Sequence, residues 1–176
     1  MPNWFTGNVE ISHTNSTKME EFFAFYEEYK DKLDDDDIDV GGLFNNEFAP
    51  LSQGEWDWKV AIEEWGSKWG IGKILGWGIL PSNKLCIGFE SAWTMPNKMF
   101  KQLTDKGFRV ESTGYEVGVG FMARFKDGKT DTKDLETEEL MEFAKKECED
   151  DWDDEMIAED MWDYVSDYCE WYWNHN

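Results

Sequence analysis

Carboxylates are the side chains in this sequence that offer the most chemistry. The 176 residues include 39 Asp and Glu, 17 Lys and Arg and 2 His, which gives a formal net charge of −22. Clustered carboxylates hold divalent cations, and bound metal ions can catalyse hydrolysis. In the run "DDDDIDVGGLFNNE", counted from Asp35, Asp37 and Asp39 fall at the third and fifth ligand positions of a calcium loop. Because Val40 stands where that loop needs Gly and Asn46 where it needs Glu, the run predicts no dedicated calcium site; adventitious binding of divalent ions stays open.

The other reactive side chains form no catalytic pattern. His13 and His175 are not spaced with a Ser, Cys or Asp as a nucleophile and its base would be. In "GSKWGIGKI" the first Gly comes one residue too early for a phosphate-binding loop, and Ile74 stands where the loop needs Ser or Thr. The three Cys form neither a CxxC pair nor a zinc spacing. The sequence therefore predicts a protein that is not an enzyme and has no cofactor or metal.

The carboxylates are concentrated towards the C-terminus. Residues 131–176 hold 18 acidic and 3 basic side chains, whereas residues 1–130 hold 21 acidic and 14 basic. A field of this sign repels nucleic acid and anionic membranes at long range and attracts basic surfaces. We therefore expect a basic nucleic-acid-binding protein as the partner, with no direct binding of nucleic acid or membrane.

The segment 147–173 combines this charge with aromatic residues. Of its 27 residues 12 are Asp or Glu and none is Lys or Arg, yet it holds four Trp and three Tyr. On a helix, one apolar face is formed by Ile157, Met161, Tyr164, Val165, Tyr168 and Tyr172. Trp152 and Met156 are out of phase with that face, which predicts a bend between two helices near "EDDWDDE". The apolar face predicts that 156–172 packs against the rest of the protein.

A neighbouring face of the same segment is acidic, and we interpret it as a surface for a partner. Trp side chains at such a surface serve as contact anchors. The candidate partner-binding residues are Glu149, Asp150, Asp153, Asp154, Asp160, Asp163, Asp167, Glu170, Trp162 and Trp171.

Periodicity and turn residues predict the elements that position these side chains. We expect strands at 8–12, 73–80, 84–93 and on both sides of a turn near "STG" (112–114), and a loop at 40–55. We expect helices within 14–33, near 56–66, at 95–106, at 137–148 and at 153–172. This order predicts an α+β fold in which a ferredoxin-like antiparallel sheet carries helices on one face, with an acidic C-terminal helical extension. The predicted units are a domain at 1–127, a linker at 128–136 and the extension, docked on the domain, at 137–176.

Four segments also resemble a known family. They are "MPNW" (1–4), "WGSKWG" (65–70), "FESAWTMP" (89–96) and "GYEVGVGF" (114–121). In order and spacing they are similar to the YubB-type ferredoxin-like domain family of bacteriophages, plasmids and mobile elements, over residues 1 to about 127. Phe5 replaces a Cys that the family usually has, and Gly70 replaces an acidic residue. The resemblance implies a fold and a mobile-element setting but no catalytic residues.

These observations lead to three hypotheses. The first is a non-enzymatic, acidic inhibitor from a phage or mobile element, a DNA mimic that blocks the basic groove of a host defence complex such as a CRISPR effector or a restriction enzyme. The second is an interaction module whose charge serves only solubility, and the third is a carboxylate- or metal-dependent hydrolase. No run of about 18 apolar residues and no secretory signal is present, and the odd number of Cys is typical of reduced thiols. We therefore expect a cytoplasmic protein of a bacterial host cell.

Overall fold

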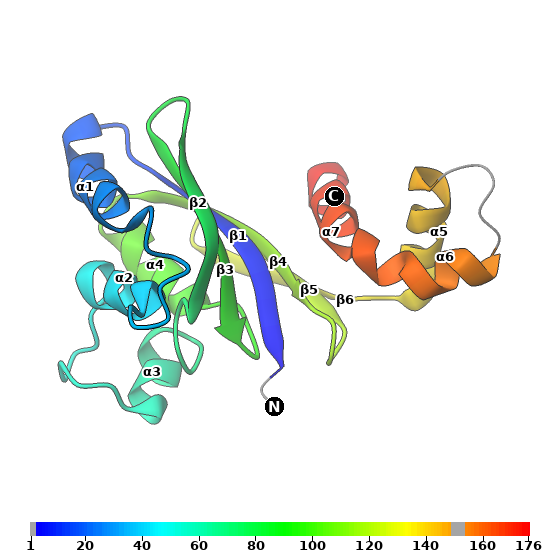
Figure 1. Cartoon of the computed structure of the whole chain (residues 1–176), viewed down its shortest axis with the longest axis horizontal. Helices are drawn as coiled ribbons and strands as arrows, with labels where there is room; N and C mark the ends of the chain where they lie inside the picture. Colours follow the sequence, from blue (N-terminus) through cyan, green and yellow to red (C-terminus); the bar gives the residue numbers. More distant parts are fainter. Residues whose placement is uncertain (1–2, 149–153) are drawn as a thin grey trace.

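An antiparallel sheet of six strands forms the centre of the protein (Figure 1). The computed structural model describes residues 3–148 and 154–176. The strands are β1 (Trp4–Ser12), β2 (Lys73–Leu80), β3 (Lys84–Ala92), β4 (Arg109–Glu116), β5 (Phe121–Lys126) and β6 (Lys129–Asp134). They lie in the order β2-β3-β1-β4-β5-β6, and every neighbouring pair is antiparallel. With its helices the protein has the α+β fold that the sequence predicts.

The first helices of the chain pack on one face of this sheet. They are the 3-10 helix η1 (Ser16–Met19) and the α-helices α1 (Glu20–Tyr29), α2 (Val40–Phe48), α3 (Trp58–Glu64) and α4 (Asn97–Asp105). Alternation along β1 turns Phe5 and Ile11 towards this face, and both side chains are fully buried. The ring of Phe89 on β3 meets Phe100 of α4 at a centroid distance of 5.8 Å. The main hydrophobic core therefore lies between the sheet and α1–α4.

The C-terminal helices pack on the opposite face, over β4 and β5. They are α5 (Thr137–Glu147), α6 (Asp154–Asp160), the 3-10 helix η2 (Met161–Tyr164) and α7 (Val165–His175). Met122 of β5 points to this side and is fully buried against them in a second hydrophobic cluster. The helices of residues 1–127 lie on one face of the sheet as predicted, and the C-terminal helices, for which the prediction gave no face, lie on the other. Among the described residues, none of the helices has the length and apolar character needed to span a bilayer.

Two further features differ from the predictions. The segment 128–136 is not a linker, since it contains β6, which pairs along its length with β5. Asp127 and Gly128 have φ angles of 51° and 75°, as the two-residue turn of a tight hairpin requires. The "STG" segment lies inside β4, and the turn follows it, where the carboxylate of Glu116 accepts a hydrogen bond of 2.8 Å from the Gly118 amide.

Candidate functional site

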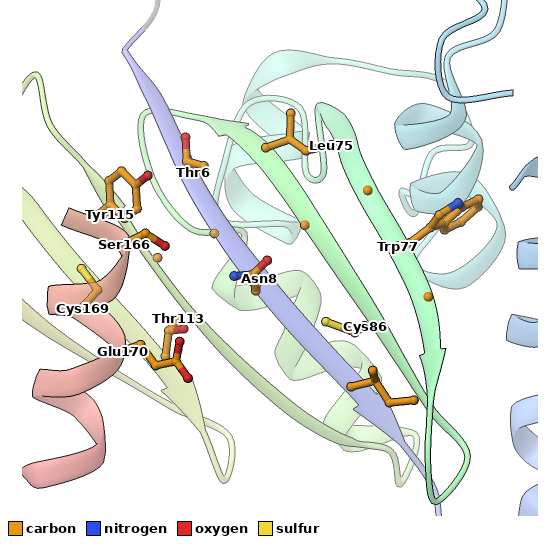
Figure 2. Close-up of a pocket in the computed structure, with 16 residues that line it drawn as sticks. Thr6, Asn8, Leu75, Trp77, Cys86, Thr113, Tyr115, Ser166, Cys169 and Glu170 are labelled. Atoms are coloured by element: carbon orange, nitrogen blue, oxygen red, sulfur yellow. The ribbon is translucent and has the colours of Figure 1, made fainter. Parts of the chain in front are cut away.

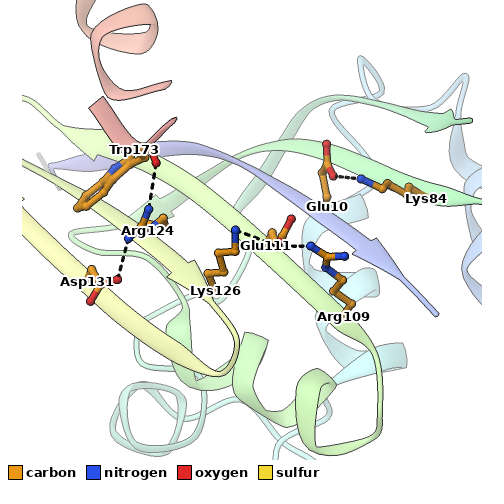
Figure 3. A network of polar contacts seen from close by, with 8 residues as sticks. All are labelled: Glu10, Lys84, Arg109, Glu111, Arg124, Lys126, Asp131 and Trp173. Carbon is orange, nitrogen blue, oxygen red and sulfur yellow. Dashed lines mark hydrogen bonds and ion pairs between the residues drawn. The ribbon is translucent and has the colours of Figure 1, made fainter. Parts of the chain in front are cut away.

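Contacts with β5 and β6 hold the C-terminal helices on the sheet. The Cys169 sulfur of α7 lies 3.5 Å from the Met122 sulfur of β5. Arg124 of β5 donates a hydrogen bond of 3.0 Å to the carbonyl of Trp173, and its guanidinium lies 4.7 Å from the centre of that indole ring (Figure 3). These contacts fix the position of α7 relative to the sheet.

A polar link joins β6, α5 and α7. Glu139 of α5 forms an ion pair with Lys133 of β6 and accepts a hydrogen bond of 2.6 Å from the Tyr168 hydroxyl of α7. The Lys133 ammonium and then the Tyr168 hydroxyl hold the pKa of Glu139 below its ordinary range, because both stabilise the carboxylate. Burial and then the same hydrogen bond raise the pKa of Tyr168. The three elements therefore form one connected layer.

The apolar face predicted for this segment is the face that packs. Ile157, Met161, Val165 and Tyr168 are buried, Tyr164 and Tyr172 are half-buried, and Met156 is exposed. Cys169 is also buried, and the sequence analysis missed it because a lone Cys carries no pattern of its own. Burial raises the pKa of the Cys169 thiol to about 12, so the thiol is neutral at physiological pH.

The acidic face of the same segment points to solvent. Asp160, Asp163, Asp167 and Glu170 are exposed, and no cation of the described residues forms an ion pair with any of them. Of the other predicted acidic site residues, Glu149, Asp150 and Asp153 lie outside the described residues, and Asp154 is described only as the first residue of α6. The structure thus brings four of the predicted carboxylates onto one fixed helical segment.

The carboxylates also affect two tyrosines of the layer. Burial is the main cause that raises the pKa of Tyr164, and Cys148, Asp160 and Asp163 add to it. For Tyr115 of β4, burial is again the first cause of a raised pKa, followed by Cys169 and then Asp167. A negative charge on either phenol is disfavoured next to these carboxylates, so the electrostatic potential along η2 and α7 is negative.

The two predicted tryptophan anchors differ in their surroundings. Trp162 and Trp171 have exposed fractions of 42% and 43%. The Trp171 ring lies 5.7 Å from Phe143 of α5 and stacks at 5.1 Å on His175. It borders a hollow between α5 and α7, whereas Glu170 borders a groove on the other side of α7. Trp171 therefore helps to join two helices, and Trp162 is the anchor that stays available.

The groove beside Glu170 lies between α7 and the half of the sheet that the C-terminal helices leave open (Figure 2). Its volume is about 500 Å³. Polar side chains line it from α7, β1 and β4, whereas its part over β2 and β3 is formed by glycines together with Leu75, Trp77, Leu80 and Cys86. The lining includes Thr6, Asn8, Thr113, Tyr115, Ser166 and Glu170, with Gly76, Gly78 and Gly88 in the floor. Across the described residues, no three His, Cys, Asp or Glu side chains are grouped in a way that could hold a metal ion.

Cations on this open face of the sheet are matched by carboxylates (Figure 3). Four of them lie between 2.7 and 3.6 Å from a carboxylate oxygen. The pairs are Lys84 with Glu10, Arg109 and Lys126 with Glu111, and Arg124 with Asp131. These cations are therefore not available to neutralise the exposed carboxylates of α6, η2 and α7.

A second exposed surface joins three of the segments that carry the family resemblance. The rings of Trp4 and Trp69 lie 5.3 Å apart, and the Lys68 ammonium lies 5.0 Å from Trp69 and 5.7 Å from Trp93. Trp93 donates a backbone hydrogen bond of 2.9 Å to Asn3. Sequence reasoning noted these segments separately and missed that they meet, although tryptophan in each of them was the signal.

Comparisons of the chain with protein-family models, with curated proteins and with solved structures give no match. The family resemblance therefore stays a prediction.

Proposed function

We propose that this protein is a non-enzymatic inhibitor whose C-terminal helices occupy the basic nucleic-acid groove of a host defence complex, a CRISPR effector or a restriction enzyme. One observation carries the proposal. The exposed carboxylates Asp160, Asp163, Asp167 and Glu170 have no described cation partner, and the opposite side of the same helical segment is buried. The charge is therefore both unneutralised and held in place, as recognition by a basic groove requires.

The spacing of the carboxylates supports mimicry of nucleic acid. Residues three or four apart on a helix place their charges at intervals of roughly 4.5 to 6 Å, by a rise of about 1.5 Å per residue. Duplex DNA carries one charge per about 1.7 Å of its axis. The carboxylates are sparser but have the same sign, and they follow one another along α6, η2 and α7, so a groove lined with Lys and Arg can accept them. Trp162, exposed beside Asp163, is positioned to add an apolar contact.

A ferredoxin-like core is part of the same proposal. Strands β2-β3-β1-β4 are all antiparallel, and helices connect β1 to β2 and β3 to β4. This is the connection order of a split βαβ arrangement, to which β5 and β6 add two strands. Together with the YubB-type segments, it favours an origin in a bacteriophage or mobile element and action in the cytoplasm of its host cell.

Charge reversal tests the proposal against the alternative that the charge serves only solubility. The test variant changes Asp160, Asp163, Asp167 and Glu170 to Lys. The matched control changes Asp34, Asp35, Asp36 and Asp37 to Lys, which alters the net charge by the same amount in another part of the surface. Far-UV circular dichroism and a thermal melt establish that both variants are folded.

The assay measures competition with nucleic acid. A pull-down from a host that carries defence systems supplies the complex, and fluorescence anisotropy then follows displacement of its DNA or RNA as salt is raised from well below to well above physiological concentration. We expect the wild type and the loop control to displace nucleic acid, with competition weakening as salt rises, and the C-terminal variant to have no effect. If both variants displace nucleic acid equally, or if neither does, the position of the charge is irrelevant and the proposal of nucleic-acid mimicry is wrong.

The hydrolase alternative has a separate test. A metal-dependent hydrolase binds Mg²⁺ or Mn²⁺ stoichiometrically, because its chemistry needs the ion in a defined site. Isothermal titration calorimetry of the whole chain with each ion measures this directly. Stoichiometric, tight binding would favour the hydrolase, and its absence would dismiss it.

A further inference from the structure

The two edge strands of the sheet differ in their protection against pairing with another chain. An edge strand presents unpaired backbone groups, and charged side chains on it prevent unwanted pairing. The β6 edge has this protection, with Lys129, Asp131, Lys133 and Asp134 among its six residues. The β2 edge has no charged residue between Ile74 and Leu80. Unlike β6, β2 is therefore open to strand addition.

Apolar side chains and free backbone groups mark the same edge. Leu75, Ile79 and Leu80 have exposed fractions of 48%, 41% and 38%. Within the part of the chain that the structure describes, β2 forms its backbone ladder with β3 alone. Its other side therefore presents a row of backbone donors and acceptors beside exposed apolar side chains.

Two glycines of β2 have no role in packing within the chain. A Cβ atom added at Gly76 or Gly78 would meet no atom within 4 Å, and neither residue has a positive φ. Gly7 differs, because a Cβ there would lie 2.6 Å from the Thr113 carbonyl of the neighbouring strand. Glycine inside a strand weakens it and often marks a bulge or the close approach of a ligand or another backbone. Gly76 lies at a bulge of β2, and both glycines lie in the floor of the groove beside Glu170, so they leave the face of this edge strand without side chains.

Charge selects among the possible occupants of this edge. The hairpin 73–92 carries only Lys73, Lys84 and Glu90, and it lies at the opposite edge of the sheet from β6 (Figure 1). A nucleic acid is repelled by the net charge of −22, and a basic protein is attracted to the acidic C-terminal helices instead. A second copy of this chain carries the same net charge of −22, but it presents an uncharged, apolar strand at the contact itself, and physiological salt screens the more distant charges beyond about 8 Å.

We propose that β2 pairs with β2 of a second copy of this chain, antiparallel and about a two-fold axis, so that the two sheets become one. Such a contact is isologous and closed, since the β2 strands of the two copies pair with each other and no unpaired β2 edge remains. The acidic helices of the two copies then lie towards opposite ends of the joined sheet. The dimer would offer two acidic surfaces, but its formation does not depend on the function proposed for them.

The experiment is sedimentation equilibrium of the full chain over a wide range of micromolar concentrations at physiological salt. We expect a species of twice the 20.7 kDa chain mass. The variant Leu75→Lys with Ile79→Lys places cations on both β2 edges and should weaken the dimer at least about tenfold in Kd. Thr132→Lys, an exposed residue of the β6 edge, is the control and should leave the Kd unchanged.

Hydrogen exchange gives a readout that does not require a variant. In the wild type, amide protection of 73–80 should rise with protein concentration while that of β6 does not. The proposal would be overturned by any of three results: a monomer at all concentrations, a dimer that persists in the Leu75→Lys, Ile79→Lys variant, or a sedimenting mass that keeps growing with concentration. Because the acidic residues are unchanged in these variants, competition with nucleic acid still tests the inhibitor proposal separately.

Discussion

Replacing Met122 by Ala should release the C-terminal helices while the sheet stays folded. Met122 is fully buried in the second hydrophobic cluster, and its sulfur touches Cys169 of α7. Truncation of a buried Met to Ala costs about 2 to 5 kcal/mol. The truncated side chain packs between the sheet and α7, so the cost falls on docking of the helices. The equilibrium constant for their opening should rise by about 30-fold to several thousand-fold, since about 1.4 kcal/mol corresponds to a factor of ten.

Alkylation of Cys169 reports this opening. The thiol is buried and neutral when α7 is docked, because burial raises its pKa to about 12. Only the thiolate of an opened molecule reacts, so its rate is proportional to the opening constant when closing is fast. Iodoacetamide labelling in native buffer, read by mass spectrometry of the separate Cys peptides, gives the rate for Cys169 alone. We expect that rate to rise by the same factor as the opening constant.

Met99→Ala is a matched control for this measurement. Met99 is also fully buried, but it belongs to α4 and to the main core on the other face. It should lower the urea midpoint of the whole protein and leave the labelling rate of Cys169 in native buffer nearly unchanged. Equal acceleration by both substitutions would show that α7 opens only when the entire chain unfolds, and would refute the reasoning.

Three smaller predictions concern the same layer and its supports. The free energy of unfolding should fall as pH rises from about 9 to 12, because the folded state keeps Cys169 protonated above the pKa of the unfolded thiol, and Tyr168, whose pKa is also raised, adds to the fall at the upper end. The Cys169 contribution is up to about 1.4 kcal/mol per pH unit; urea titrations at each pH check this, and Cys169→Ala should remove that contribution. Arg124→Ala should lower the free energy of unfolding by about 2 to 3 kcal/mol, since it removes the hydrogen bond to Trp173 and the cation above its ring. The exposed Lys126→Ala is the control and should change it little; urea denaturation measures both. Gly128→Ala should cost about 1 to 2 kcal/mol because φ is 75° there, again measured by urea denaturation.

Features set by neighbouring residues were predictable from the sequence. The hairpin β2–β3 was predicted from two strand-like runs around "PSN", and Ser82 and Asn83 have the positive φ angles of a tight turn. Helix α4 ends before Gly107, whose φ is 93°, as a glycine after a helix favours. The buried face of the C-terminal helices followed from spacing alone. Each of these depends on residues close together in the chain.

Features set by distant residues were not predictable in this way. Gly, Asn and Pro predicted a loop at 40–55, yet α2 forms at Val40–Phe48. Asp39 caps its start locally, accepting a hydrogen bond of 2.8 Å from Gly42, but distant residues hold the helix in place. Asn45 of α2 is buried, and its side chain bonds the backbone of both Trp69 and Ile71. Such tertiary bonds outweigh local propensity, which is a weak preference.

The face of the sheet on which the C-terminal helices pack also depends on residues that are distant in the sequence. It is determined by side chains of β4–β6 that lie well before α7 in the sequence. The hairpin turn at Asp127 and Gly128, in contrast, was predictable from the sequence, since an Asp-Gly pair between alternating residues is a local signal of a turn. The prediction of a linker at 128–136 overlooked this signal.

The placement of the acidic residues argues for recognition over solubility. Solubility depends on net charge, which carboxylates spread over the surface would supply equally well. Asp160, Asp163, Asp167 and Glu170 instead follow one another along α6, η2 and α7, and like charges three or four residues apart on a helix repel by a few tenths of a kcal/mol per pair. Burial of the opposite face against Met122 and its neighbours offsets that repulsion. A stripe that costs folding energy, and that gives no more solubility than the same charge spread over the surface, favours the proposed basic partner.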